Sequence, residues 1–115
     1  MNRKIEMMDF YGIYTPVITP HNDDYSIDEA GFAAMIEHLI ASGVHGIIIA
    51  GTTGEYYAQT MEERKRMLHL GVEIINGRVP SIGGTGAMRT EDSIDLAKTA
   101  KQAGTDAILV ATPPY

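Results

Sequence analysis

Residues 46–55, Gly-Ile-Ile-Ile-Ala-Gly-Thr-Thr-Gly-Glu, constrain the fold of this chain more than any other stretch. The first half is a short apolar run rich in β-branched residues, which predicts a buried strand of a parallel sheet. The second half places Thr52 and Thr53 between two glycines, which free the backbone so that both threonines can present N–H and O–H groups to a ligand. α/β folds hold their sites at strand ends of this kind, although the same residues also suit a plain connecting turn.

Strand and helix patterns alternate along the rest of the chain. Apolar runs predict strands over residues 12–20, 46–50 and 107–111, and residues 80–86 predict a short strand that leads into a Gly-Thr-Gly turn. Helical patterns lie between these segments. Pro16 interrupts the first strand, which must begin, end or bulge there because proline donates no ladder hydrogen bond. The connections are too long for hairpins, so the order β-α-β-α-β-α-β predicts a parallel sheet with crossover helices. Residues 42–50 weakly resemble residues 103–111, a repeat that suits a (β/α)8 barrel or a doubly wound sheet.

Capping residues set the expected helix boundaries. Ser26 with Glu29, and Thr60 with Glu63, each fit a capping box, and Thr90 is expected to cap the third helix. The expected helix ends are Gly43, Gly77 and Gly104.

Apolar spacing predicts one buried face on each helix. The predicted buried residues are Phe32, Met35, Ile36, Leu39 and Ile40; Met67, Leu68, Val72 and Ile75; and Ile94, Ala97 and Ala100. The last strand, residues 107–111, is also expected to be buried. The charged cluster of the second helix, in which Glu62 and Arg66 stand four apart, is interpreted as a solvated face.

Composition excludes several classes of protein. The chain has 115 residues, 44% of them hydrophobic, which is enough for one modest core over residues 11–115. Residues 1–10 lack the apolar centre of a signal peptide and are expected to be a flexible leader. The expected location of the protein is the cytoplasm. A net charge of −6 without a basic block argues against nucleic acid, and no apolar run is long enough for a membrane. The chain has no cysteine, so disulfides and thiolate chemistry are excluded.

No metal or organic cofactor is expected. His21, His38, His45 and His69 lack the spacing of metal ligands. The glycine-rich turn at residues 83–86 matches neither the P-loop nor the dinucleotide fingerprint.

Glu55 is expected to brace its turn by accepting backbone N–H bonds.

Hydroxyl-bearing residues follow three of the predicted strands. Thr52 and Thr53 follow the second, Thr85 follows the third, and Thr112 with Tyr115 follows the fourth. In a barrel these residues would meet at the C-terminal face, whereas in a doubly wound sheet they would spread along one edge.

These motifs together resemble the dihydrodipicolinate synthase / N-acetylneuraminate lyase family. The matching segments are residues 17–20, 26–28, 51–55, 84–87 and 112–115, so the resemblance covers residues 11–115. It implies an α/β fold of the (β/α)8 TIM barrel family, of which this chain supplies about the first half.

The resemblance also implies a chemistry. Members are class I lyases or aldolases that handle pyruvate or a related 2-keto acid through a Schiff base on a lysine. Thr52 would relay protons, and Thr53 would hold the carboxylate of the small keto-acid substrate, with Gly51 in the same binding loop. Tyr115 matches a tyrosine that crosses a subunit interface to complete the proton relay, which implies a homo-oligomer, a dimer or a tetramer. Preorganised N–H and O–H donors are what a carboxylate needs.

The sequence departs from the family in one essential respect. The family's Schiff-base lysine lies on the sixth strand and its other relay tyrosine on the fifth, and neither strand is present. Lys65, Lys98 and Lys101 fall within predicted helices and Lys4 in the leader, whereas an imine former is a desolvated amine. Three interpretations stay open: the N-terminal part of a longer lyase, inactive alone; a non-catalytic half-barrel that binds small carboxylates or self-associates; or a different barrel enzyme that binds phosphorylated ligands at residues 84–86.

The substrate is open as well. Tyr56 and Tyr57 are bulkier than the residues usual in the biosynthetic synthases, which makes an aldolase or dehydratase of a 2-keto-3-deoxy sugar acid an alternative. Met61 and Arg64 stand where lysine-inhibited members carry histidines, and Pro114 replaces a tyrosine, which argues against feedback inhibition by lysine.

Overall fold

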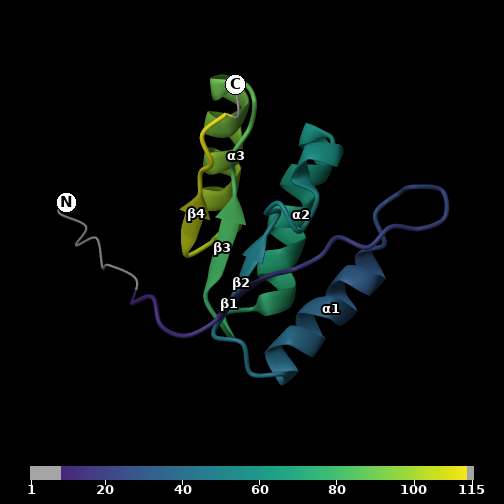
Figure 1. The fold of residues 1–115 in the computed structure, drawn as a ribbon, viewed down its shortest axis with the longest axis vertical. Coiled ribbons are helices and arrows are strands. Elements are labelled where there is room, and N and C mark those ends of the chain that lie inside the picture. The colour runs from purple at the N-terminus through teal and green to yellow at the C-terminus, as the bar shows by residue number, and fades with distance from the viewer. Residues whose placement is uncertain (1–8, 114–115) are drawn as a thin grey trace.

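The protein is described here by a computed structural model that covers residues 9–113, and it forms a four-stranded parallel sheet with helical crossovers (Figure 1). The strands lie in the order of the sequence: β1 (Tyr14–Pro16), β2 (Gly46–Ile49), β3 (Ser81–Gly84) and β4 (Ala107–Leu109). The connections contain the helices α1 (Glu29–Ala41), α2 (Met61–Ile75) and α3 (Thr90–Ala103), with a 3₁₀ turn, η1 (Tyr56–Ala58), before α2. The predicted β-α order and the parallel sheet are therefore confirmed. No helix among residues 9–113 is both long and apolar enough to cross a bilayer.

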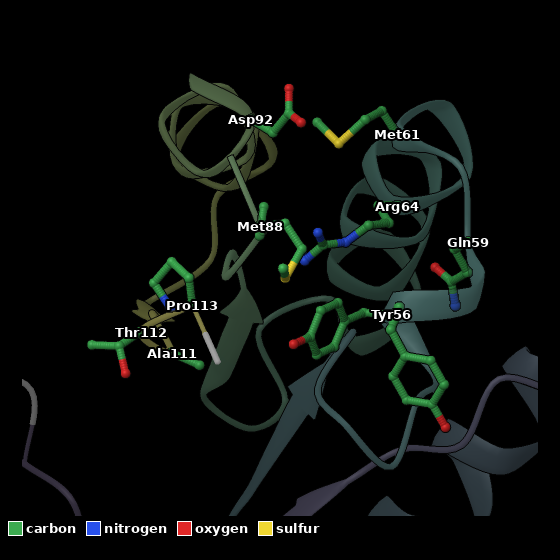
Figure 2. Close-up of a pocket in the computed structure, with 11 residues that line it drawn as sticks. Tyr56, Gln59, Met61, Arg64, Met88, Asp92, Ala111, Thr112 and Pro113 are labelled. Atoms are coloured by element: carbon green, nitrogen blue, oxygen red, sulfur yellow. The ribbon is translucent and has the colours of Figure 1, made fainter. Parts of the chain in front are cut away.

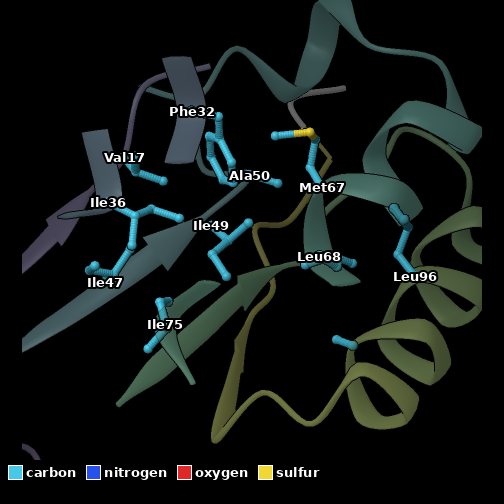
Figure 3. Close-up of a cluster of buried hydrophobic side chains, with 11 residues drawn as sticks. Val17, Phe32, Ile36, Ile47, Ile49, Ala50, Met67, Leu68, Ile75 and Leu96 are labelled. Carbon is cyan, nitrogen blue, oxygen red and sulfur yellow. The ribbon is translucent and has the colours of Figure 1, made fainter. Parts of the chain in front are cut away.

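The core lies between the sheet and the helices (Figure 3). Ile47 and Ile49 of β2 are fully buried, and α2 lies so close to β2 that a Cβ at Gly71 would come within 2.5 Å of Ile49 Cδ1. The helical residues of the core include Phe32, Ile36, Met67, Leu68, Ile75, Leu96 and Ala100. The buried faces predicted for α1 and α2 thus lie where expected, although Met35, Leu39, Ile40 and Val72 are only half-buried.

The backbone hydrogen bonds explain how β1 accommodates Pro16. Val17 N donates to Ile48 O at 3.0 Å, and Gly46 N donates to Ile13 O at 3.3 Å. Alternate residues of a strand point their N–H and C=O groups to opposite sides, so Pro16 faces away from β2. Its missing N–H therefore removes no ladder bond, and β1 ends at Pro16 as one of the predicted alternatives requires.

The helix caps are partly as predicted. The capping box of Thr60 and Glu63 is confirmed, with bonds of 2.9 and 3.1 Å. The prediction that Ser26 caps α1 was wrong. Asp28 is the N-cap, and its side chain accepts a hydrogen bond from Gly31 N at 2.8 Å. Ser26 is unable to serve, since its carbonyl accepts from Asn22 N and the adjoining residue Ile27 forms a bridge with His21.

The other helix ends show a similar mixture. Thr90 is the first residue of α3 and not its cap, and Arg89 at the cap position makes no side-chain capping bond. Gly43 and Gly104 have φ of +88° and +94°, which confirms both as left-handed residues at helix ends. α2 ends at Ile75, and both its C-cap residue Asn76 and the following Gly77 are left-handed, with φ of +48° and +72°.

Two predictions of burial were wrong. Ile94 of α3 is 50% exposed, because the helix turns Leu96, Thr99 and Ala100 inward instead. Ile108 and Leu109 of β4 are 45% and 49% exposed. The reason is that β4 is an edge of the sheet within residues 9–113, with no further described strand against it.

Two arginines of the α2 region tie it to α1. Arg66 donates to both carboxylate oxygens of Glu29 at 2.8 and 3.0 Å, and Arg78 donates likewise to Glu37 at 2.9 and 2.7 Å. The expected pairing of Arg66 with Glu62 is therefore replaced by a contact between helices. Each arginine lowers the pKa of its glutamate through these hydrogen bonds. A lowered carboxyl pKa means that this stabilisation is present at neutral pH and is lost as the glutamates are protonated in acid.

The ends of β2 and β3 lie too close for a side chain at Gly84. A Cβ there would come within 2.1 Å of the carbonyl oxygen of Ala50, a backbone atom that has little room to move. Gly84→Ala should lower the free energy of unfolding by about 3 kcal/mol, measured by urea denaturation. The control Ile82→Val in the same strand should cost about 1 kcal/mol. Equal losses in the two variants would contradict the close approach.

Candidate functional site

The loop after β2 carries three of the predicted site residues. Gly51 is buried, whereas Thr52 and Thr53 are exposed on the turn that follows. Ala50 has a φ of +58°, which is unusual for a residue with a side chain and turns the chain sharply out of the strand. The hydroxyl and amide groups of Thr52 and Thr53 thus stand at the C-terminal end of the sheet, where they can contact a ligand.

A buried threonine from the neighbouring strand braces this loop. Thr19, which follows β1, is 6% exposed, and its hydroxyl donates to Gly54 O at 2.8 Å. Gln59 Nε2 donates to the same carbonyl at 3.0 Å and lies 3.3 Å from the Thr19 hydroxyl. Three segments that are separate in the sequence therefore converge on one carbonyl group.

The sequence did not predict this brace. Glu55 was expected to hold the turn, but it is exposed, has a φ of +57° and makes no side-chain capping bond. Thr19 follows β1 as Thr52 follows β2, so the rule that selected Thr52 could also have selected Thr19. No comparable signal marks Gln59, whose role depends on the path of η1.

The hydroxyls of Thr85 and Thr112 make no hydrogen bond to the loop of Gly51, Thr52 and Thr53 within the described residues. Thr85 is fully buried at the end of β3, its N–H donates to Leu109 O at 2.9 Å, and its hydroxyl makes no hydrogen bond within the described residues. Thr112 is exposed and lines a separate cavity. Tyr115 lies outside the described residues.

The cavity lies between α2, the loop before α3 and the segment after β4 (Figure 2). It has a volume of about 350 Å³ and is lined by Tyr56, Tyr57, Gln59, Met61, Arg64, Ala87, Met88, Asp92, Ala111, Thr112 and Pro113. None of Gly51, Thr52 and Thr53 borders it. The two positions at which the resemblance places histidines in lysine-inhibited members, Met61 and Arg64, both do.

Arg64 is the buried charge of this cavity. It is only 4% exposed, which contradicts the prediction that the charged cluster of α2 is entirely solvated. Its guanidinium lies 4.6 Å from the centre of the Tyr56 ring, and Nη2 donates weakly to Gly84 O at 3.4 Å. Burial lowers the pKa of Arg64, while Tyr56 and Asp92 oppose that shift. Stacking on the ring and the charge of Asp92 together make burial of the cation tolerable.

No metal centre is formed by the described part of the chain. Among residues 9–113, no three histidine, aspartate or glutamate side chains gather closely enough to hold an ion.

Comparison with known proteins decides the family. Residues 9–115 match the dihydrodipicolinate synthetase family. The chain belongs to that family. It is 43% identical over 109 residues to the 4-hydroxy-tetrahydrodipicolinate synthase of Desulfotalea psychrophila, covering 95% of this chain and 36% of the relative. The synthase of the same name from Bartonella bacilliformis is 45% identical over 104 residues, covering 90% of this chain and 35% of the relative.

Solved structures of this family agree with the fold. YagE, a prophage protein of the family from E. coli K12 solved in complex with pyruvate, superposes with a TM-score of 0.89 at 39% identity, over 92% of this chain and 36% of YagE. Dihydrodipicolinate synthase DapA-2 of Bacillus anthracis gives a TM-score of 0.89 at 38% identity, over 95% and 37%. The predicted (β/α)8 barrel fold is thereby confirmed, with this chain as a partial barrel. The chain spans little more than a third of the length of these relatives.

Removing the Thr19 hydroxyl should loosen the loop that carries Thr52 and Thr53. Thr19→Val keeps the shape of the side chain but deletes the donor to Gly54 O, so we expect a loss of about 1.5 kcal/mol in unfolding free energy. Amide exchange of residues 51–54 should accelerate at the same time. Thr19→Ser, which keeps the hydroxyl, should preserve the slow exchange of the loop; fast exchange in the serine variant would argue against the brace.

Proposed function

We propose that this chain forms the substrate-carboxylate side of a class I lyase site acting on pyruvate or another 2-keto acid. The observation that carries the proposal is the position of Thr52 and Thr53, exposed at the C-terminal end of the sheet on a loop held by Thr19 and Gln59. Family membership and the pyruvate complex of YagE support a keto acid as the ligand.

The proposed roles follow from the chemistry of the side chains. Thr53 and the loop beginning at Gly51 would donate N–H and O–H groups to the carboxylate, because fixed donors stabilise an anion without reorganisation. Thr52 would pass protons to and from the reacting centre, in a relay completed by Tyr115 of a second subunit.

The described lysines do not supply the imine. Lys98 and Lys101 are exposed on α3, and Lys65 of α2 pairs with Asp95 at 2.5 Å. An amine that forms a Schiff base is desolvated and has a lowered pKa, and none of the three is placed in that way. We therefore propose that the Schiff-base lysine is contributed by sequence outside these 115 residues, and that the chain alone is inactive.

The substrate class has one specific alternative. Tyr56 and Tyr57 follow the binding loop directly, and their rings meet edge to face at 5.8 Å. Because the biosynthetic synthases usually carry smaller residues at these two positions, a 2-keto-3-deoxy sugar acid is the second candidate substrate. A comparison of pyruvate with a 2-keto-3-deoxy sugar acid as competing ligands would decide between the two.

A non-catalytic half-barrel that associates with itself is the second candidate function. The observation that favours it is the exposed apolar run of Ile108, Leu109 and Val110 at the β4 edge. Exposed apolar edge strands pair with other strands unless they are covered. Light scattering of the eluting peak in size-exclusion chromatography should give a mass of a dimer or tetramer, and Leu109→Lys should shift it toward the monomer. A monomer at all concentrations would contradict self-association.

The Schiff-base proposal can be tested by reductive trapping. Incubation of the chain with pyruvate and borohydride, followed by intact-mass measurement, should give no adduct, because none of the lysines among residues 9–113 is placed as an imine former. The positive control is a longer protein of the family that carries the sixth-strand lysine, which should gain one pyruvate adduct. An adduct on the chain itself would overturn the assignment of the lysine to other sequence.

A further inference from the structure

The residues that precede β2 and β4 make the same pair of hydrogen bonds to a neighbouring strand. His45 N donates to Ile13 O at 2.8 Å, while His45 Nδ1 accepts from Ile13 N at 2.9 Å. Asp106 N donates to Ser81 O at 2.9 Å, while Asp106 Oδ2 accepts from Ser81 N at 2.8 Å. We call each reciprocal pair a clasp. Each one joins the beginnings of two adjacent parallel strands.

The two clasps occupy equivalent positions of the internal repeat. In residues 42–50 and 103–111, His45 and Asp106 both stand at the fourth place, directly before the strand. Both copies of the repeat therefore have a side-chain acceptor at this point of the fold. The acceptor is an imidazole nitrogen in the first copy and a carboxylate oxygen in the second. An imidazole nitrogen accepts only when it is unprotonated, whereas a carboxylate ordinarily still accepts at about pH 5.

The first clasp is the attachment of the segment before β1. Gly12 has a φ of +82°, and a Cβ there would lie 2.2 Å from both Cγ and Nδ1 of His45, so the backbone passes directly over the imidazole. The Tyr11 ring meets the imidazole edge to face at 5.2 Å. Tyr11 and Ile13 are otherwise 73% and 67% exposed, so little apolar burial holds this segment in place.

The surroundings of His45 do not include a charged partner among the described contacts. The titratable side chain of the segment that touches the imidazole is Tyr11. On the sheet side, Tyr14 of β1 lies over Gly46, the residue next to His45. None of the ion pairs formed within residues 9–113 includes His45.

We propose that His45 makes the attachment of residues 11–13 to the sheet sensitive to pH, while the Asp106 clasp is insensitive over the same range. Protonation converts Nδ1 from an acceptor into a donor, which then opposes the Ile13 N–H at the same position. The charge of a histidine ordinarily changes between about pH 5 and 8, so the clasp is closed in the upper part of this range and opens in the lower part.

The test is the amide exchange of Ile13 and Ser81 in the 115-residue chain, expressed as protection factors so that the intrinsic pH dependence of exchange is removed. Between about pH 7.5 and 5, the protection of Ile13 should fall roughly fivefold, the value expected for one lost hydrogen bond. The protection of Ser81 should stay constant. A constant protection factor at Ile13 would overturn the proposal.

Substitutions separate the clasp from general effects of acid. His45→Asp should keep Ile13 protected at both pH values, because it turns the first clasp into the chemistry of the second. His45→Ala should leave Ile13 weakly protected at both. His69→Asn, which removes an exposed histidine of α2, should leave the original pH dependence intact. Loss of Ile13 protection at low pH in His45→Asp would contradict a role for the imidazole.

Discussion

The close approach of the ends of β2 and β3 is the constraint on which the candidate site depends. Only glycine fits at position 84, because a Cβ would strike the carbonyl of Ala50, and Ala50 itself adopts a left-handed conformation at the same point. The chain then leaves β2 in a fixed direction, and the Thr19 hydroxyl and Gln59 amide hold the following turn from two sides. A loop held in this way can present Thr52 and Thr53 in one orientation, which is the preorganisation that anion binding requires.

The helices support this arrangement by fixing the sheet from its packed face. α2 is central, because Gly71 lets it approach Ile49 closely and because its Arg66 reaches Glu29 of α1. Arg64 on the same helix is buried beside Tyr56 and reaches the backbone of Gly84. α2 therefore contacts β2 through Gly71, β3 through Arg64 and α1 through Arg66. The cavity around Arg64 is not lined by Gly51, Thr52 or Thr53, although Gln59 both lines it and holds the threonine loop.

Much of the fold could be predicted from the sequence because local signals and topology agree. Apolar runs, the Thr60 capping box and the glycines at helix ends indicated the order of elements, and Thr52 and Thr53 lie exposed after β2, as expected of residues that follow a strand. Contacts between distant segments could not be predicted in this way. Asp28 replaces Ser26 as the cap because a bridge ties down Ile27, Arg66 prefers Glu29 to its helical neighbour, and Thr19 braces a carbonyl 35 positions away. The prediction that β4 is buried was wrong for a related reason. Burial of a strand depends on neighbouring elements, and a local sequence pattern carries no information about them.

The proposed function requires that the loop of Gly51, Thr52 and Thr53 binds the carboxylate of a keto acid. The most direct measurement is a titration of the ¹⁵N-labelled chain with pyruvate, followed through the amide resonances of residues 51–54. We expect saturable shifts that are confined to this loop and weakened by Thr53→Val, while the amides around Arg64 stay unchanged. Shifts centred on Arg64 and Tyr56, or no shift at the loop, would contradict it.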